Sequence, residues 1–200
     1  MGRRAENRDI GEDFGPSAEL SGLLLTSEAA YAMEVRGGTD AAVLLPLHGW
    51  PDEPGLIFTE RRADMRRHAG EISFPGGRRD EGDADLAATA LREAEEEIGL
   101  DPAAVELSGA LPPASTFVTG YRIHPFVGLI PDPAELDLEP NPTEVETVLA
   151  FSLEGLRAGY AMRRLVRRGV PIHTPTYEVD GHLIWGATAR ILGDLLERLG

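Results

Sequence analysis

Four acidic side chains stand close together near the middle of the chain. Five consecutive positions, 93 to 97, hold Glu93, Glu95, Glu96 and Glu97, flanked by Arg92 and Gly99. Like charges this close repel one another on a helix, so a stable helix here needs a counterion. Oxygen-only ligation by carboxylates suits Mg²⁺ or Mn²⁺ and does not suit zinc. Because Mg²⁺ commonly bridges carboxylates to substrate phosphates, the cluster predicts metal-assisted chemistry on a phosphate compound.

Helical spacing predicts which of these carboxylates act together. At about 100° per residue, one face of the helix is apolar and packs on a core, and it carries Ala87, Leu91, Ala94 and Ile98. Glu93 and Glu97 lie one turn apart on another face with Glu96 beside them, whereas Glu95 points to solvent. We therefore predict Glu93, Glu97 and Glu96 as metal ligands. The Gly76-Gly77 pair ahead of the helix lets the backbone approach a ligand closely, which predicts a substrate contact.

The same stretch resembles a family signature. Residues 92–100, R-E-A-E-E-E-I-G-L, match the second half of the Nudix box at every fixed position. Counted from Gly77, the first glutamate of the box falls on Asp83, and the gap from Asp83 to Arg92 is one residue longer than usual. The resemblance implies a Nudix-type α/β/α sandwich with a mixed sheet, hydrolysis dependent on Mg²⁺ or Mn²⁺, and an Arg92 that orients a carboxylate. The alternative is a solvated acidic helix without a ligand.

A group of arginines precedes the glycine pair. Residues 61–68, R-R-A-D-M-R-R-H, hold four arginines in an otherwise acidic chain. A solvated loop is one interpretation, and a phosphate clamp is the other, since guanidinium groups match phosphate oxygens in pairs. Residues 58–77 also resemble the signature of the coenzyme A pyrophosphatase branch of the family, with Phe58 in place of Leu and Arg62 in place of Ser or Ala. Arg61 and Arg66 occupy the arginine positions of that signature, which implies that they bind substrate phosphates.

The two resemblances together imply a reaction. The substrate would be coenzyme A or a derivative, and the products adenosine 3′,5′-bisphosphate and 4′-phosphopantetheine. A general base is expected either at Glu144, which follows a proline-rich loop and opens a strand, or at Glu96 beside the metal ligands. Alternatives are a pyrophosphatase for ADP-ribose or a dinucleotide such as NADH, a non-enzymatic ligand sensor on the same fold, and a simple cation-binding protein. A sensor would be expected to lose box carboxylates, which this chain keeps.

Composition excludes several other classes. The chain has 200 residues and a net charge of −15, which disfavours nucleic-acid binding through a basic surface. All 19 basic residues are arginines, so lysine chemistry is excluded, and the absence of cysteine excludes thiol catalysis and cysteine-ligated zinc. No apolar run is long enough for a membrane span and no signal sequence is apparent, so we predict a cytoplasmic protein whose partner is a small nucleotide.

Periodicity gives the expected elements. Residues 1–16 read as a flexible tail, and 17–200 as a single domain. We expect strands at 41–47, 56–60, 105–111, 123–130 and 144–151, and helices at 16–33, 153–156 and 187–199 in addition to the acidic one. Asp180-Gly181 predicts a hairpin between 176–179 and 182–185. The arginines at 163, 164, 167 and 168 are expected at a solvated helix end, and the alternative is a contact to a ligand or partner.

Overall fold

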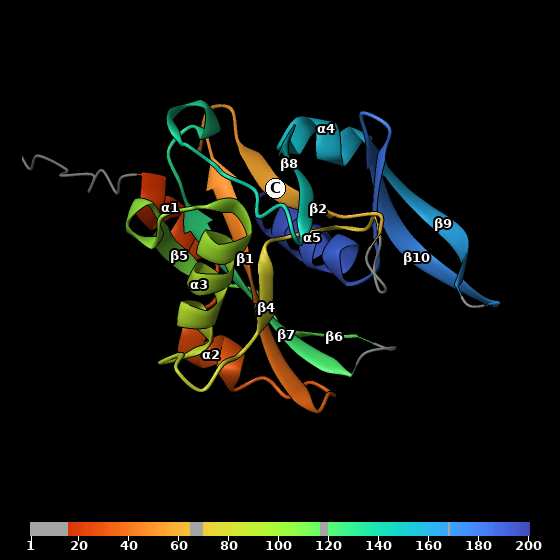
Figure 1. Ribbon diagram of the computed structural model, residues 1–200, viewed down its shortest axis with the longest axis horizontal. Coiled ribbons are helices and arrows are strands. Elements are labelled where there is room, and N and C mark those ends of the chain that lie inside the picture. Colours follow the sequence, from red (N-terminus) through yellow and green to blue (C-terminus); the bar gives the residue numbers. More distant parts are fainter. Residues whose placement is uncertain (1–15, 65–69, 117–119, 168) are drawn as a thin grey trace, which may run out of the picture.

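A mixed sheet lies between two layers of helices in the computed structural model, which describes residues 16–64, 70–116, 120–167 and 169–200 (Figure 1). The main strand order is β3 (Ile72–Ser73), β2 (Gly55–Arg61), β1 (Thr39–His48), β7 (Tyr121–Leu129) and β5 (Glu106–Ala110). Three more strands pair with this path: β4 (Gly76–Arg78) with β1, β6 (Ala114–Ser115) with β7, and β8 (Val145–Ser152) with β2. β1 and β7 run parallel and the other pairs are antiparallel, which confirms the predicted mixed sheet.

Strand β1 has a hydrophobic core on each of its faces. Ala42 and Leu44 belong to the core under α2 (Ser27–Tyr31) and α3 (Leu86–Ile98). Leu45 and Leu47 belong to the other core, with α1 (Pro16–Leu23), α4 (Leu153–Ala158) and α5 (Gly186–Arg198). Because successive strand residues point to opposite faces, a continuous apolar run buries both sides, as the sequence predicted for 41–47. The α/β/α sandwich is thereby confirmed.

The acidic helix is α3, and its buried side is rotated from the predicted one. Its core residues are Leu86, Ala90, Ala94 and Ile98, whereas Ala87 and Leu91 are only partly buried. The Asp85 carboxylate caps the helix by accepting a hydrogen bond of 2.8 Å from the Ala88 amide. The helix ends at Gly99, which adopts a left-handed φ of 68° suited to glycine. A short 3₁₀ helix follows at Pro102–Ala104.

The N-terminal helix expected over 16–33 is interrupted. Leu25 pairs with Ala110 at the edge of β5, and the Thr26 hydroxyl caps α2 by accepting a 3.1 Å hydrogen bond from Ala29. A polar residue that prefers a cap position therefore divides the segment into α1 and α2. The tail predicted for 1–16 lies, apart from Pro16, outside the described residues.

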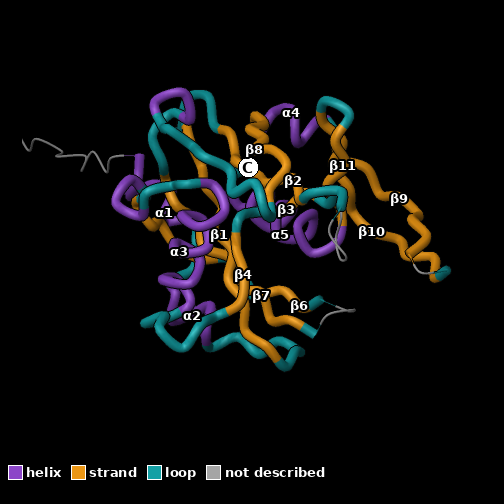
Figure 2. Tube along the Cα trace, in the orientation of Figure 1, coloured by secondary structure: helices purple, strands orange, loops and turns teal. Residues whose placement is uncertain are grey.

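A second sheet projects from the body of the molecule (Figures 1 and 2). It consists of β9 (Tyr160–Arg167), β10 (Val170–Val179) and β11 (His182–Trp185), and Asp180 and Gly181 both have positive φ in the predicted hairpin turn. The expectation of a helix end for the second arginine group is wrong, because Arg163 and Arg164 lie in β9 opposite Thr174 and His173 of β10. The other expected strands overlap β2, β5, β7 and β8, and the loop after β7 contains a 3₁₀ turn at Pro133–Glu135. No helix among the described residues is long and apolar enough to cross a membrane.

Candidate functional site

Arg92 joins the acidic helix to the loop before it. Its Nε and Nη2 donate to the two carboxylate oxygens of Asp83 at 2.9 and 3.1 Å, and Nη2 also donates to the Arg78 carbonyl at 3.1 Å. Nη1 donates to Glu96 at 3.0 Å, and Nη2 lies 3.0 Å from Glu93. Arg92 thus contacts three carboxylates and fixes the positions of Glu93 and Glu96 relative to the loop.

Asp83 is the buried partner in this network. Only 6% of its side chain is exposed, and it also accepts hydrogen bonds from the Thr89 hydroxyl at 2.8 Å and the Asp80 amide at 2.9 Å. The Arg92 guanidinium holds the pKa of this carboxyl well below its usual range, despite its burial. In the Nudix signature this position is a glutamate and the gap to the arginine is one residue shorter. Here the shorter side chain of Asp83 still reaches Arg92. The sequence placed Asp83 in the box but did not reveal Thr89 as its support.

Glu97 is the most enclosed carboxylate of α3. It is 8% exposed, and its Oε2 accepts a hydrogen bond of 3.2 Å from the Gly76 amide. Burial raises its pKa to about 7, an effect opposed by the Gly76 hydrogen bond and reinforced by the charges of Glu93 and Glu144. Burial also raises the pKa of Glu93, which Arg92 opposes and Glu96 and Glu144 reinforce. Glu93, Glu97 and Glu144 are therefore close enough to repel one another.

The glycine pair serves the packing of β4 between β1 and α3. A Cβ on Gly77 would lie 2.4–2.5 Å from the Glu93 carboxylate, and a Cβ on Gly76 would lie 2.3 Å from the Ala42 carbonyl oxygen. The space above both glycines is thus filled by protein atoms. We predicted that the pair lets a ligand approach the backbone; here it lets Glu93 and the Ala42 backbone approach, and any substrate contact stays a prediction.

The donor chemistry fits a divalent cation. Glu93 and Glu97 offer oxygen ligands from partly or fully desolvated positions, and their mutual repulsion with Glu144 would be relieved by a positive ion. Glu96 differs, because 58% of its side chain is exposed and it pairs with Arg92. Among the residues that the structure describes, no three His, Asp or Glu side chains are already gathered as a ligand set. The convergence of Glu93, Glu96 and Glu97 on one ion stays a prediction. The charge of Glu96 acts on Glu93, and the charge of Glu144 acts on both Glu93 and Glu97.

Arg61 and Glu144 complete the neighbourhood. Arg61 ends β2 and its Nη2 lies 3.7 Å from Oε2 of Glu144, which directly precedes β8. The Arg62 amide donates to the Glu144 carbonyl at 3.1 Å, so the backbone of the strand pair fixes this contact. The Nε of Arg61 is buried and has no hydrogen-bond partner among the described residues. Arg66, the other predicted phosphate ligand, lies outside the described residues.

Comparisons with known proteins agree with this geometry. The family model described as NUDIX domain matches residues 40–169. Proteins of Escherichia coli O1:K1 and Shigella boydii serotype 18, each named Uncharacterized Nudix hydrolase NudL, are 41% identical over 162 residues, which cover 80% of this chain and 82% of theirs.

Solved structures show the same fold at low identity. A MutT/nudix family protein from Enterococcus faecalis superposes with a TM-score of 0.55 at 14% identity, over 84% of this chain and 64% of that one. A Nudix hydrolase from M. smegmatis, RenU, gives 0.50 at 18% identity, over 68% and 81% of the two chains. The family model and the relatives at 41% identity cover most of the chain, including the acidic helix and its loop. The chain therefore belongs to the Nudix family as a Nudix hydrolase.

Proposed function

We propose that this Nudix hydrolase cleaves the diphosphate of coenzyme A or its acyl derivatives, releasing adenosine 3′,5′-bisphosphate and 4′-phosphopantetheine. The observation that carries the proposal is Arg61, whose guanidinium lies beside Glu144 and has a buried Nε without a partner among the described residues. A cationic donor beside an acidic metal site suits a substrate with more phosphate than the diphosphate alone. The signature residues around Arg61 favour coenzyme A as that substrate.

Nudix hydrolases generally use divalent metal ions, and we propose Mg²⁺ or Mn²⁺ here. Glu93 and Glu97 would hold the ion, which when bound neutralises phosphate charge and lowers the pKa of a bound water. Arg92 keeps Glu93 oriented through its 3.0 Å contact, and Asp83 keeps Arg92 in place. We place the general base at Glu144, whose charge acts on both Glu93 and Glu97, whereas Glu96 accepts a hydrogen bond from Arg92.

The substrate assignment is tested by product analysis. The protein is incubated with Mg²⁺ or Mn²⁺ and with coenzyme A, dephospho-coenzyme A, ADP-ribose or NADH, and the products are identified by mass. We expect coenzyme A to be preferred over dephospho-coenzyme A. A preference for ADP-ribose or NADH would replace the proposal by the alternative that shares this metal site.

A variant pair tests the role of Arg61. Loss of a charge-assisted contact costs about 1.5–3 kcal/mol, so Arg61→Ala should lower kcat/KM on coenzyme A roughly 10- to 100-fold and reduce the preference over dephospho-coenzyme A. Arg66→Ala is expected to behave alike. Arg62→Ala is the matched control, because Arg62 pairs with Asp64 at 2.9 Å instead. An equal loss on both substrates would show that Arg61 acts on the diphosphate or through Glu144.

A further inference from the structure

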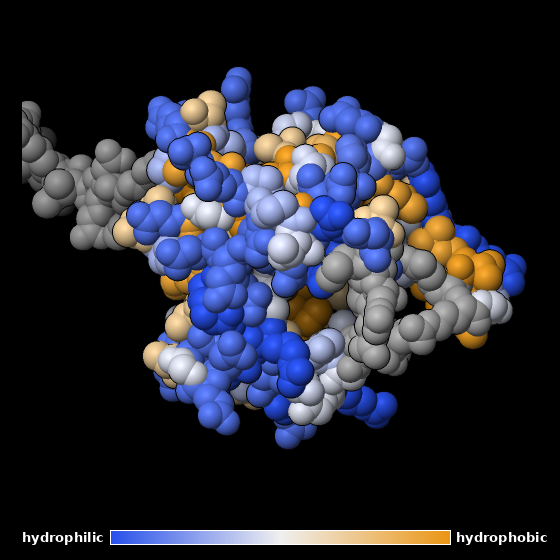
Figure 3. All heavy atoms as spheres, viewed as in Figure 1, coloured by the Kyte–Doolittle hydropathy of each residue, from blue (hydrophilic) through white to orange (hydrophobic). Residues whose placement is uncertain are grey.

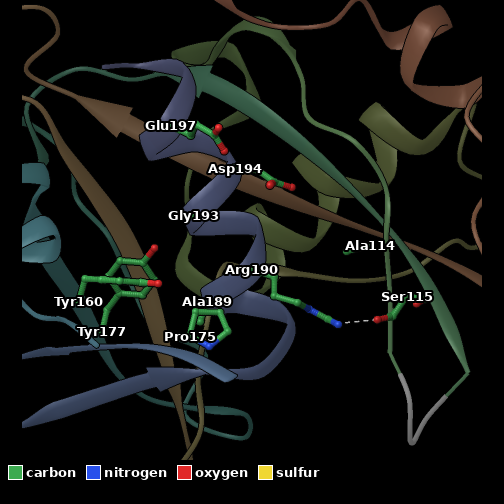
Figure 4. Close-up of a pocket in the computed structure, with 10 residues that line it drawn as sticks. All are labelled: Ala114, Ser115, Tyr160, Pro175, Tyr177, Ala189, Arg190, Gly193, Asp194 and Glu197. Carbon is green, nitrogen blue, oxygen red and sulfur yellow. Dashed lines mark hydrogen bonds between the residues drawn. The ribbon is translucent and has the colours of Figure 1, made fainter. Parts of the chain in front are cut away.

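A cavity of about 530 Å³ lies between β6, the hairpin of β9 and β10, and helix α5. Its walls include Ala114 and Ser115 on one side and the rings of Tyr160 and Tyr177, 5.5 Å apart, on the other. Figure 4 shows Arg190 reaching across to donate to the Ser115 carbonyl, at 2.6 Å. The cavity therefore has the size and mixed lining of a small-molecule site, and it is separate from the Glu93–Glu97 pair.

The sheet connects this cavity to β4. Arg78, Ala41, Ile123 and Ala114 are register partners in one row across β4, β1, β7 and β6. Three strand spacings of about 4.8 Å place Ala114 roughly 14 Å from Arg78, a distance that about four peptide-length units of an extended chain would span. Partly buried Val43, Ile123 and Ala114 belong to the α5 side of the sheet. Figure 3 shows a hollow with hydrophobic atoms at its bottom between β4 and β6.

The charges at the cavity select against phosphate. Asp194 and Glu197 line it from α5 (Figure 4). Arg190, also in the lining, donates to Ser115. Carboxylates repel a phosphorylated nucleoside and accept hydrogen bonds from amide N–H and hydroxyl groups. Tyrosine rings and alanine walls suit methyl and methylene groups. The fitting ligand is a neutral, flexible arm that carries amides.

We propose that this cavity binds the pantetheine arm of the substrate while the diphosphate lies near Glu93 and Glu97. The proposal rests on the proposed function and adds the direction in which the substrate lies, with the phosphorylated nucleoside toward Arg61. The neutral arm passes β4, whose described pairing is with β1, and lies on the face of β1 and β7 that α5 covers. An acyl group on the thiol would extend past the exposed Tyr160 toward the apolar hairpin face that also carries Met162 and Val166.

Two cavity-filling variants from opposite walls test the assignment. Gly193→Leu starts from a glycine whose Cβ would approach the Tyr177 hydroxyl at 3.2 Å, and it replaces a poor helix former by a good one. Ala114→Leu fills the cavity from β6. Glu154→Leu on α4 is the control, because Glu154 is exposed and does not line the cavity. Calorimetric titrations use the two expected products, 4′-phosphopantetheine and adenosine 3′,5′-bisphosphate, with Mg²⁺ present, since neither contains a diphosphate to hydrolyse.

The expected result is selective. Both fillers should weaken 4′-phosphopantetheine binding about 10- to 200-fold, as added methylenes in a filled pocket do, and leave adenosine 3′,5′-bisphosphate unaffected. The proposal is overturned if the fillers weaken the nucleotide instead, if they weaken neither, or if wild type does not bind 4′-phosphopantetheine at millimolar concentration. Selective loss of binding together with no turnover of coenzyme A would sink the proposed function and leave the arm site standing.

Discussion

The carboxyl group of Glu97 is buried against β4, where its only described hydrogen bond is from the Gly76 amide. Its raised pKa means that the charged form is disfavoured in the folded chain, so without metal the contribution of this one group to stability is greatest below the ordinary glutamate pKa. This contribution is lost as pH rises toward the folded pKa of about 7. A group placed for cation binding therefore costs stability when no cation is bound.

Glu97→Gln should separate these two effects. In EDTA, we expect the variant to be more stable than wild type by up to about 3 kcal/mol at pH 8 and equally stable near pH 4, because glutamine has no charge to bury. Urea unfolding at both pH values measures the difference. The same variant should lose most hydrolytic activity in Mg²⁺, since an amide is a weaker ligand for a hard cation. A stability difference that does not change with pH would contradict the assignment.

The two adjacent glycines should respond differently to alanine. In Gly77→Ala the new methyl group meets the flexible end of Glu93, so the side chain moves and activity falls at least about tenfold with a small change in stability. In Gly76→Ala the methyl group meets the backbone of Ala42 and Val43, so unfolding free energy should fall by about 1–3 kcal/mol. Thermal unfolding and kinetics on both variants, with Gly82→Ala in open space as control, test the pair. Equal stability losses would show that Glu93 cannot move.

Glu144→Gln and Glu96→Gln test the identity of the base. A general base contributes about 10² to 10⁴ in rate, so Glu144→Gln should lower kcat within that range and Glu96→Gln much less. Metal affinity, measured separately, should change little in Glu96→Gln because Glu96 contacts Arg92 and is largely exposed. Near wild-type kcat in Glu144→Gln with an inactive Glu96→Gln would reverse the two roles.

At the scale of elements, α3 depends on the loop that precedes it. Asp83 of the loop accepts hydrogen bonds from two side chains of the helix, those of Arg92 and Thr89. Neither contact is within one turn of helix, so the loop and the helix stabilise each other's position as a unit.

Asp83→Asn should loosen this unit. Loss of a charge-assisted pair in a buried position costs about 1.5–3 kcal/mol at pH 7. The depressed pKa of Asp83 means that its contribution is present above the ordinary aspartate pKa and is lost as pH falls below it. The variant and wild type should therefore differ most in urea unfolding at pH 7, and the difference should shrink progressively as pH falls below about 4. Asp80→Asn, an exposed neighbour, is the control, and a difference of the same size at pH 7 and pH 2 would contradict the charge argument.

The sequence predicted the elements whose pattern is local. The apolar run of β1, the Asp180-Gly181 turn and the leucine stripe of α5 each carry their periodicity within a few residues. One error arose where distant contacts decide the structure. Residues 160–167 resemble a helix end by charge but form β9 through pairing with β10. The buried side of α3 includes Leu86 and Ala90 in place of the predicted Ala87 and Leu91. The reason is that Glu97 is also buried, and hydrophobic periodicity does not count a polar residue.

At the scale of the whole molecule, β1 joins the two cores and carries β4, the strand whose Gly76 amide contacts Glu97. The projecting hairpin contrasts with it, since Tyr160, Val166 and Val170 are each more than half exposed there. Strand β1 is therefore packed on both faces, whereas the β9–β10 hairpin has a largely exposed face.

This position of β1 has a consequence for hydrogen–deuterium exchange. The Leu44 amide donates to the Pro75 carbonyl at 2.9 Å between two buried layers, so it can exchange only when the molecule opens globally. We expect amides of β1 and the facing part of β7 to exchange last and at a common free energy equal to that of unfolding, and those near the tip of the β9–β10 hairpin to exchange decades sooner. Mass spectrometry of peptic fragments would resolve the two groups, and early exchange in β1 would contradict the expectation. Because β4 pairs with this slowest strand, the hydrogen bond from the Gly76 amide to Glu97 should persist through every partial opening of the hairpin.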